Sequence, residues 1–356
     1  MKKVLIFEIS SKNHAIMIYN WVLICKSRYY NCNVLTTREI YEQVKNKIDE
    51  LNFDFNIYFI EDLSNLEKVS LIRSMESIVV TSFQNRFHYY IPLLFCKSRV
   101  FITIHNVNRW FGRAQIQSLK GMIKSFYRKL FLYRADGFIV NSKNMLDSIP
   151  KDFIHKTAVV PFSLYQKERP LDSCREKVVV YPGMVTKKRK DYRIFLSLAE
   201  RNPDMKFVLL GKVINNEGGR DIINEIHSKN LNVVFFERYV DDKVFSDYMQ
   251  IASLIFADIP SDVILDGYKE IYGVTKDSGV SYLSSEYNLP LLVNSSFKNL
   301  PQLRSLTSYY SDVYEADFEI KKLLSLDNIR VQNLEQRKEL LCSSQWNLIL
   351  KFIEGN

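Results

Sequence analysis

The chain has 356 residues, of which 47% are apolar and only 11 are Gly and 9 are Pro, so it is long enough for two hydrophobic cores and too apolar for disorder. The formal net charge of +9 lies in the N-terminal half, because residues 1–165 hold 23 Lys and Arg against 13 Asp and Glu. This positive field suggests an anionic neighbour for one domain. No nucleic-acid-binding module accompanies it, and we expect no nucleic acid among the partners.

The first residues, the lengths of the apolar runs and the cysteines argue against a secreted, membrane-spanning or disulfide-rich protein. Lys2 and Lys3 precede a short apolar run. Polar residues at 8–13 interrupt this run, so it is too short for the apolar core of a signal peptide. No stretch reaches the roughly 18 to 20 apolar residues of a membrane-spanning helix. The 5 cysteines are widely spaced, so we expect reduced core residues rather than disulfides or a zinc site. The sequence predicts a cytoplasmic protein, with peripheral binding to the inner face of the cytoplasmic membrane as an option.

Short β-branched runs alternate with segments of helical period along the first half of the chain, which is typical of βαβ units. The expected strands are apolar on both faces, as in a buried parallel sheet, and lie at residues 3–7, 33–36, 56–60, 77–81, 100–104, 137–140 and 157–161. An apolar helical run lies at 16–25. We therefore expect a Rossmann-like N-terminal domain over residues 1–168.

Residues 165–177 are polar, contain a Pro and have no apolar period, which marks a domain linker. The pattern then restarts, with strands expected at 178–181, 207–210, 233–236, 254–257 and 290–293, and helices at 191–201, 219–229, 241–251 and 279–287. A second Rossmann-like domain over 175–338 follows. Because ligands of such sheets bind at the carboxyl ends of the strands, we expect the chemistry between two facing domains.

The sequence YPGMVTKKRKD at 181–191 places a glycine turn and four cations between a strand and a helix. A helix N-terminus with cations beside it binds diphosphates, which assigns Gly183, Lys187, Arg189 and Lys190 to the donor. The alternative is a solvated cationic loop.

Ser278 and Gly279 begin the expected helix 279–287, where backbone N–H groups and a hydroxyl would complete a phosphate cradle. The alternative is an ordinary helix cap.

Two histidines are candidates for acid–base chemistry. His105 follows the expected strand 100–104, and His14 lies in the loop after the first strand. Histidine titrates near neutrality and is able to accept a proton from an acceptor hydroxyl. A hydrogen-bonded structural role is the alternative for both.

Residues 109–134 interleave cations with aromatic and aliphatic residues at amphipathic helical spacing. Such a helix lies on anionic lipid or, alternatively, packs as a core helix with a solvated basic face. The predicted membrane or acceptor surface comprises Arg109, Trp110, Arg113, Lys120, Lys124, Arg128 and Lys129.

Several motifs are missing. The sequence has no Asp-x-Asp, Gly-x-Gly-x-x-Gly, Walker, HExxH, GxSxG or paired-cysteine motif, which disfavours dehydrogenases, NTPases and zinc hydrolases. We expect no metal and no cofactor.

The order of motifs resembles that of group 1 glycosyltransferases, family 4 and its relatives, over almost the whole chain. The matching segments are FITIHN at 101–106, ADGFIVNS at 135–142, TAVVP at 157–161, the turn at 181–190 with FVLLG at 207–211, YVDD at 239–242 and SSQW at 343–346. The resemblance implies a GT-B fold, with two facing Rossmann-like domains and a C-terminal crossover helix at 339–356.

The resemblance also implies the reaction. Such enzymes move a sugar from a nucleoside diphosphate to an acceptor, retain anomeric configuration and usually need no divalent metal. Here Met184 replaces a frequent Arg, and Leu283 stands where many members place a Glu on the donor ribose. Glu286 lies one turn from that position. An inverting enzyme with His105 or His14 as general base therefore stays open.

We accordingly expect a glycosyltransferase that uses a nucleotide-sugar donor and a glycan acceptor, lipid-linked at a bacterial membrane, for surface polysaccharide such as lipopolysaccharide or capsule. The alternative class is a non-catalytic sugar-nucleotide-binding or scaffold protein, since degenerate donor motifs are typical of relatives that have lost their chemistry.

Overall fold

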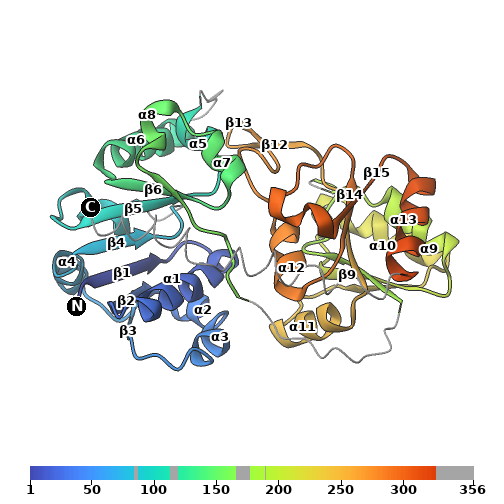
Figure 1. Cartoon of the computed structure of the whole chain (residues 1–356), viewed down its shortest axis with the longest axis horizontal. Helices are drawn as coiled ribbons and strands as arrows, with labels where there is room; N and C mark the ends of the chain where they lie inside the picture. The colour runs from blue at the N-terminus through green and yellow to red at the C-terminus, as the bar shows by residue number, and fades with distance from the viewer. Residues whose placement is uncertain (84–86, 113–118, 166–176, 189, 326–356) are drawn as a thin grey trace.

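The computed structural model describes residues 1–83, 87–112, 119–165, 177–188 and 190–325. These residues form two parallel sheets, each covered by helices and each built from one half of the chain (Figure 1). The predicted fold class, an α/β protein with two facing Rossmann-like sheets, is confirmed. The crossover helix expected at 339–356 and the domain boundary expected between 168 and 175 lie outside the described residues.

The first sheet has seven parallel strands in the order β3-β2-β1-β4-β5-β6-β7. Val4 of β1 pairs with Cys32 on one side and with Ser77 on the other, so the strand order reverses between β1 and β4. Such a reversal opens a crevice at the carboxyl ends of the two strands. The strands are β1 (Lys3–Glu8), β2 (Asn31–Thr36), β3 (Asn56–Phe59), β4 (Ser77–Val80), β5 (Arg99–Ile104), β6 (Gly137–Val140) and β7 (Thr157–Val159).

Both faces of this sheet are buried, because successive side chains of a strand point to opposite faces. Val4 and Ile6 belong to one hydrophobic cluster, and Leu5 and Phe7 belong to another. The helices of this half are η1 (Lys12–His14), α1 (Ile16–Ser27), α2 (Arg38–Tyr41), α3 (Lys45–Asp49), α4 (Asn65–Arg73), η2 (Phe87–Leu94), α5 (Val107–Phe111), α6 (Leu119–Arg134), α7 (Lys143–Asp147) and α8 (Lys151–Ile154).

The second sheet has six parallel strands in the order β10-β9-β8-β11-β14-β15, with its reversal between β8 and β11. It surrounds one continuous core. The strands are β8 (Val178–Pro182), β9 (Lys206–Lys212), β10 (Val233–Phe236), β11 (Leu254–Ala257), β14 (Leu291–Asn294) and β15 (Thr307–Tyr310).

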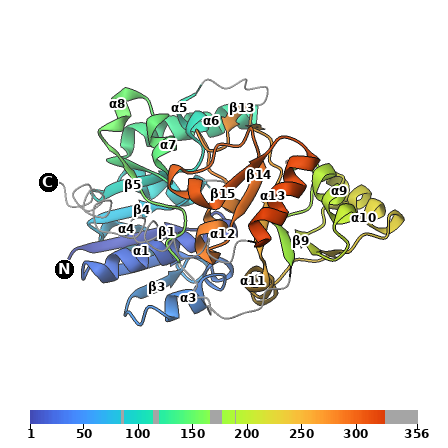
Figure 2. The same ribbon diagram turned by 45° about the vertical axis from the view of Figure 1, so that its right-hand side comes forward.

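The helices of the second half lie in two groups. Helix α13 packs against α9 and β15, whereas α12 packs against β11 and β14. Figures 1 and 2 show α9 and α10 at the far end of the molecule, with α11 and α12 nearer the first sheet. The helices are α9 (Arg193–Arg201), η3 (Asn215–Glu217), α10 (Gly219–Ser228), α11 (Asp242–Ile251), α12 (Gly279–Tyr287), η4 (Pro301–Leu306) and α13 (Val313–Ser325).

An antiparallel hairpin, β12 (Asp262–Leu265) and β13 (Tyr268–Ile271), was not expected from the sequence. Its turn residues Asp266 and Gly267 have φ values of 49° and 80°, which is the conformation of a tight two-residue hairpin turn. Figure 1 shows the hairpin beside α5 and α6, where it bridges the two halves of the molecule.

Three of the five cysteines lie in the described part of the chain, and all three are buried free thiols: Cys25, Cys32 and Cys96. No helix within the described ranges is long and apolar enough to cross a membrane.

Candidate active site

A buried carboxylate lies at the carboxyl end of the first sheet. Glu8, the last residue of β1, is 0% exposed and accepts hydrogen bonds from the hydroxyls of Thr81 at 2.7 Å and Ser82 at 2.6 Å. It also accepts the backbone N–H groups of Ser10 at 2.8 Å and Ser11 at 3.1 Å. Burial raises the pKa of Glu8, while these bonds oppose the shift. The network joins the loop after β1 to the end of β4 at the strand-order reversal.

His105, which follows β5, bridges the neighbouring strand ends. Its Nδ1 lies 3.0 Å from Oδ1 of Asn141, and its Nε2 lies 2.8 Å from the carbonyl oxygen of Thr81. Asn141 donates its amide N–H to the Val160 carbonyl, which turns its oxygen toward the histidine. Burial lowers the pKa of His105 to about 4, so the ring is neutral at pH 7. Both ring nitrogens face protein oxygens, and the neutral ring, which carries a single N–H, donates to one of the two.

His14, in η1, stacks on His105 with ring centroids 4.1 Å apart. Its Nδ1 is buried and has no hydrogen-bond partner among the described residues. Burial, followed by the charges of His105 and Lys276, lowers the pKa of His14 well below its usual range. The structure thus brings together both histidines that the sequence singled out.

Residues of the second half cover this pair. The Tyr282 hydroxyl lies 3.0 Å from the Asn141 carbonyl oxygen and 2.7 Å from Oδ2 of Asp277. The other Asp277 carboxylate oxygen accepts the Ser142 hydroxyl at 2.9 Å. The Tyr282 ring packs on Phe162 at 5.4 Å. The start of α12 therefore lies against the carboxyl end of the first sheet.

Ser278 and Gly279 begin α12 as predicted. Ser278 is the N-cap residue, but its side chain makes no capping hydrogen bond. A Cβ atom added at Gly279 would meet no atom within 4 Å. The helix start thus borders open space on the side of Gly279, and a helix N-terminus beside open space suits an anionic ligand.

Glu286, by contrast, is nearly buried and forms an ion pair with Lys47 of α3 at 3.1 Å. In this structure its carboxylate joins the two halves of the molecule.

The predicted donor turn depends on two glycines. Gly183 has a φ of 90°, a conformation that favours glycine. A Cβ atom at Gly211 of β9 would lie 2.4 Å from the backbone of Gly183, so only glycine permits this approach.

Lys190 folds back over this turn. Its Nζ donates to the Pro182 carbonyl at 2.6 Å and lies 4.6 Å from the centre of the Tyr181 ring. Burial lowers its pKa to about 7. Within the described part of the chain no carboxylate pairs with this amine, so it has capacity for an anion.

The other cations of the turn are more exposed. Lys187 pairs with Asp221 of α10 at 2.9 Å, and Lys188 lies 3.6 Å from Glu217. Arg189 lies outside the described residues.

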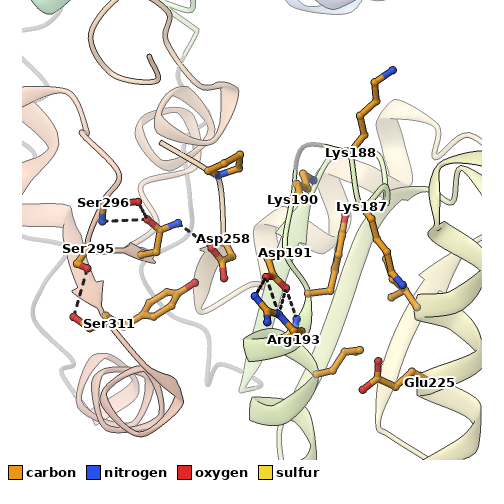
Figure 3. A pocket seen from close by; sticks show the side chains of 16 residues that line it. Lys187, Lys188, Lys190, Asp191, Arg193, Glu225, Asp258, Ser295, Ser296 and Ser311 are labelled. Carbon is orange, nitrogen blue, oxygen red and sulfur yellow. Dashed lines mark hydrogen bonds and ion pairs between the residues drawn. The ribbon is translucent and has the colours of Figure 1, made fainter. Parts of the chain in front are cut away.

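A cavity of about 720 Å³ lies at the carboxyl ends of β8, β11, β14 and β15, next to the strand-order reversal (Figure 3). Lys187, Lys188 and Lys190 line one side, and the ion pair between Asp191 and Arg193 lies in the middle. Its volume is in the range of small-molecule sites. Lys187 and Lys190 thus share this cavity, whereas Ser278, Gly279 and Glu286 are not among its lining residues.

The opposite wall of the cavity was missed from the sequence. Asp258 directly follows β11, and Asn294 ends β14; the Asn294 amide donates to the Asp258 carboxylate at 2.9 Å. Ser295, Ser296 and Ser311 complete this polar wall (Figure 3). Burial raises the pKa of Asp258. Polar residues directly after buried strands were the available signal, as for Glu8.

The predicted membrane or acceptor surface needs correction. Arg109, Lys124 and Arg128 all reach toward Asp266 of the hairpin turn, and Trp110 is buried against Phe83. The three cations lie at the contact between the two halves rather than on an open surface, because the hairpin supplies the carboxylate that their charges need, and Trp110 belongs to the core of the first half. Lys129 is exposed. Arg113 and the side chain of Lys120 lie outside the described residues.

The exposed face of α6 is instead largely apolar. Met122, Ile123, Phe126 and Tyr133 are 59%, 49%, 60% and 87% exposed. Among the described residues, no cluster of His, Cys, Asp or Glu side chains is arranged to hold a metal ion.

No protein-family model and no curated protein sequence matches the chain. Solved structures are similar over its whole length. A structure of Anabaena Alr3699/HepE in complex with UDP and glucose is 12% identical, with a TM-score of 0.66 over 100% of both chains. A glycosyltransferase from Rickettsia africae is 10% identical, with a TM-score of 0.61 over 99% of this chain and 98% of that one. A UDP-N-acetylglucosamine 2-epimerase is 12% identical, with a TM-score of 0.55 over 100% and 95%. The chain has the GT-B fold.

Proposed function

We propose that the protein is a glycosyltransferase that moves a sugar from a nucleoside diphosphate to a glycan acceptor. The observation that carries the proposal is Lys190, a cation without a carboxylate partner in the described ranges, at the carboxyl edge of the second sheet of a GT-B fold. The similar HepE structure contains UDP and glucose. A nucleotide-sugar donor is therefore the ligand class that best suits this edge.

The donor diphosphate is proposed to bind the turn of Gly183, with Lys187, Arg189 and Lys190 as its cations. Backbone N–H groups at Ser278 and Gly279 would complete the cradle, since the space at the start of α12 is open. Cations and a helix N-terminus stabilise a leaving diphosphate without a metal ion, which agrees with the expected metal-independent reaction.

The acceptor is proposed to lie at the first sheet, beside His105 and His14. His105 suits a role in orientation, because both of its nitrogens already face protein oxygens. A general base works best with a pKa near the working pH, and the pKa values of both histidines are lowered. This favours a retaining reaction over an inverting one that uses either histidine as its base.

A lipid-linked acceptor at the inner face of a bacterial membrane remains part of the proposal, in the synthesis of surface polysaccharide. The exposed apolar residues of α6, with Lys129 beside them, form a surface that suits an anionic bilayer. Sedimentation with anionic liposomes should fall in the double variant Met122→Ser, Phe126→Ser. Equal sedimentation of variant and wild type would remove α6 from the proposal.

The deciding experiment is a thermal-shift and calorimetric panel of UDP, GDP, dTDP, CMP and their sugar conjugates, without metal. A ligand at about 100 times its Kd stabilises by roughly 2.7 kcal/mol. Selective binding by one nucleotide, followed by transfer or slow donor hydrolysis, supports the proposal. Binding without either reaction supports the scaffold alternative, and isomerisation of the bound sugar without an acceptor would indicate an epimerase.

A further inference from the structure

The hairpin β12–β13 belongs to the second half of the chain but makes its polar contacts with the first half. Asp266, at its turn, forms an ion pair with Arg109 and lies 3.8 Å from Lys124 and 3.7 Å from Arg128. The side chain of Arg128 is only 6% exposed. Three cations on α5 and α6 thus share one carboxylate, so the loss of Asp266 leaves partly buried positive charges close together.

Glu270, on β13, makes the second attachment. It is 0% exposed, and its carboxylate accepts the backbone N–H groups of Arg109 at 2.7 Å and Asn108 at 3.3 Å. The Asn108 side chain donates to the Lys269 carbonyl at 2.7 Å. A buried carboxylate is costly unless it is hydrogen-bonded. Glu270 also bonds to the Thr275 hydroxyl of its own half, but both backbone N–H donors belong to the other half of the molecule. The docked position of the hairpin is therefore the one in which Glu270 has these partners.

The attachment continues from the hairpin to α12. The Val107 N–H donates to the Thr275 carbonyl at 2.8 Å, and the Asn144 side chain donates to the Gly273 carbonyl at 2.8 Å. Two residues after Thr275, Asp277 accepts the Ser142 hydroxyl. One continuous segment, residues 266–277, thus runs along α5, α6 and α7 and ends at the start of α12.

We infer that this hairpin is an interdomain clasp, in which Asp266 and Glu270 are positioning residues that hold the start of α12 against the His105 end of the first sheet. The role in transfer rests on the proposed function. Asp266 and Glu270 bond to Arg109 and Asn108 of the first half, whereas all proposed donor-binding residues lie in the second half, so the expected effect is on how donor and acceptor meet rather than on donor affinity.

The test compares Glu270→Gln and Asp266→Asn with the control Asp262→Asn. Asp262 lies on the same hairpin and pairs only within it, with Lys269 at 2.9 Å, among the contacts described. Glutamine keeps the shape of Glu270, but its NH2 group cannot accept one of the two N–H groups. We expect the amides of Asn108 and Arg109 to exchange hydrogen about 10-fold faster or more in Glu270→Gln. X-ray scattering should show an increased radius of gyration.

In the same variants the turnover number for transfer should fall about 10-fold, while the Kd for the donor nucleotide stays within about twofold of wild type. Unchanged exchange and scattering in Glu270→Gln, or an equal effect of Asp262→Asn, would overturn the clasp. A parallel loss of donor affinity would overturn its positioning role. Should Glu270→Gln fail to fold, Asn108→Ala removes the bond to Lys269 and gives the same exchange readout at smaller amplitude. Exchange and scattering do not depend on activity, so a wild-type protein without transferase activity would refute the proposed function and leave the clasp testable.

Discussion

The carboxyl edges of the two sheets face the same junction, yet they use their polar groups in opposite ways. At the first edge, Glu8, Thr81, Ser82, His105 and Asn141 bond to one another or to nearby backbone. At the second edge, Lys190 donates to a carbonyl oxygen, forms no ion pair with a carboxylate among the described residues, and borders a cavity. The comparison indicates that the first edge is a preformed wall and that the second keeps binding capacity.

The two edges also differ in their effect on stability. Hydrogen-bonded buried groups, such as Glu8 with Thr81 and Ser82 at the first edge, hold a single arrangement of the strand ends. A buried amine whose pKa is lowered to about 7 costs free energy of folding whenever it is charged. Binding sites often carry such costs, because the same charge is needed by the ligand.

The most damaging expected change is Gly211→Ala. The new methyl group would lie 2.4 Å from the backbone of Gly183, so the donor turn must move. We expect unfolding free energy to fall by about 3 kcal/mol and donor affinity to fall with it, measured by urea denaturation and calorimetry. The matched control is Gly279→Ala, where the space is open: its stability should change by less than about 1 kcal/mol while donor affinity still falls. Equal stability losses in both variants would contradict this account of the turn.

Lys190→Met should separate binding from stability. We expect roughly 100-fold weaker donor binding, because the diphosphate loses a poorly solvated cation. Below pH 7 the amine is charged in both the folded and the unfolded state, so burial of the charge lowers the free energy of unfolding by its full amount. As pH rises from 7 toward 10.5, the folded state loses its proton first and this destabilisation disappears. The variant should therefore be more stable than wild type by roughly 2 kcal/mol at pH 6, with a difference that shrinks as pH rises.

Lys187→Met is the control for this variant. Lys187 is more than half exposed and already paired with Asp221, so its removal should weaken donor binding by about threefold at most. A larger loss for Lys187 than for Lys190 would reverse the roles of the two cations.

His105→Gln tests the preformed wall by its dependence on pH. The pKa of His105 is lowered to about 4, so the neutral ring stabilises the fold above pH 6.5 and this contribution is lost as pH falls toward 4. The variant should therefore lose less stability than wild type between pH 6.5 and 4, by about 1 to 2 kcal/mol in acid denaturation. The lowered pKa of His14 also makes the wild-type protein less stable as pH falls, and this contribution is present in the variant as well. Wild-type turnover should show no acid limb near pH 6.5, and a limb there that disappears in the variant would restore His105 as the base.

Tyr282→Phe gives the smallest expected effect. It removes the hydroxyl that lies between Asn141 and Asp277 and leaves the ring on Phe162. We expect a stability loss of about 1 kcal/mol in thermal unfolding and an unchanged Kd for the donor. A marked loss of donor affinity would show that the Tyr282 hydroxyl positions the start of α12 for the donor.

All strands of the two sheets except β15 were predictable from the sequence, because most of them are short apolar runs buried on two faces. Helix 279–287 was also predicted and matches α12 (Gly279–Tyr287). The expected helix at 191 begins at Arg193 instead, because the Asp191 carboxylate accepts the Arg193 N–H. The edge strand β15 (Thr307–Tyr310) was missed, since its half-polar sequence lacks that apolar signal.

The site was only partly predictable. Spacing from a strand end locates His105 and the donor turn, whereas the polar wall at Asp258 and Asn294 is assembled from strands that meet only in the folded sheet. The sequence shows that Arg109 and Arg128 belong to a basic, amphipathic segment but gives no information about the carboxylate that pairs with them. That partner, Asp266, is more than a hundred residues away in sequence.

In both sheets the strand that is synthesised first is an interior strand with a neighbour on each side. Strand β1 pairs with β2 on one side and β4 on the other, and β8 pairs with β9 and β11. During synthesis, one edge of β8 therefore stays without its neighbour until Leu254 and the residues after it have left the ribosome. An apolar strand with an open edge is able to pair with other chains. The two sheets are alike in this respect, because β1 waits from Glu8 to Ser77 for its second neighbour and β8 waits over a similar length of chain, from Pro182 to Leu254.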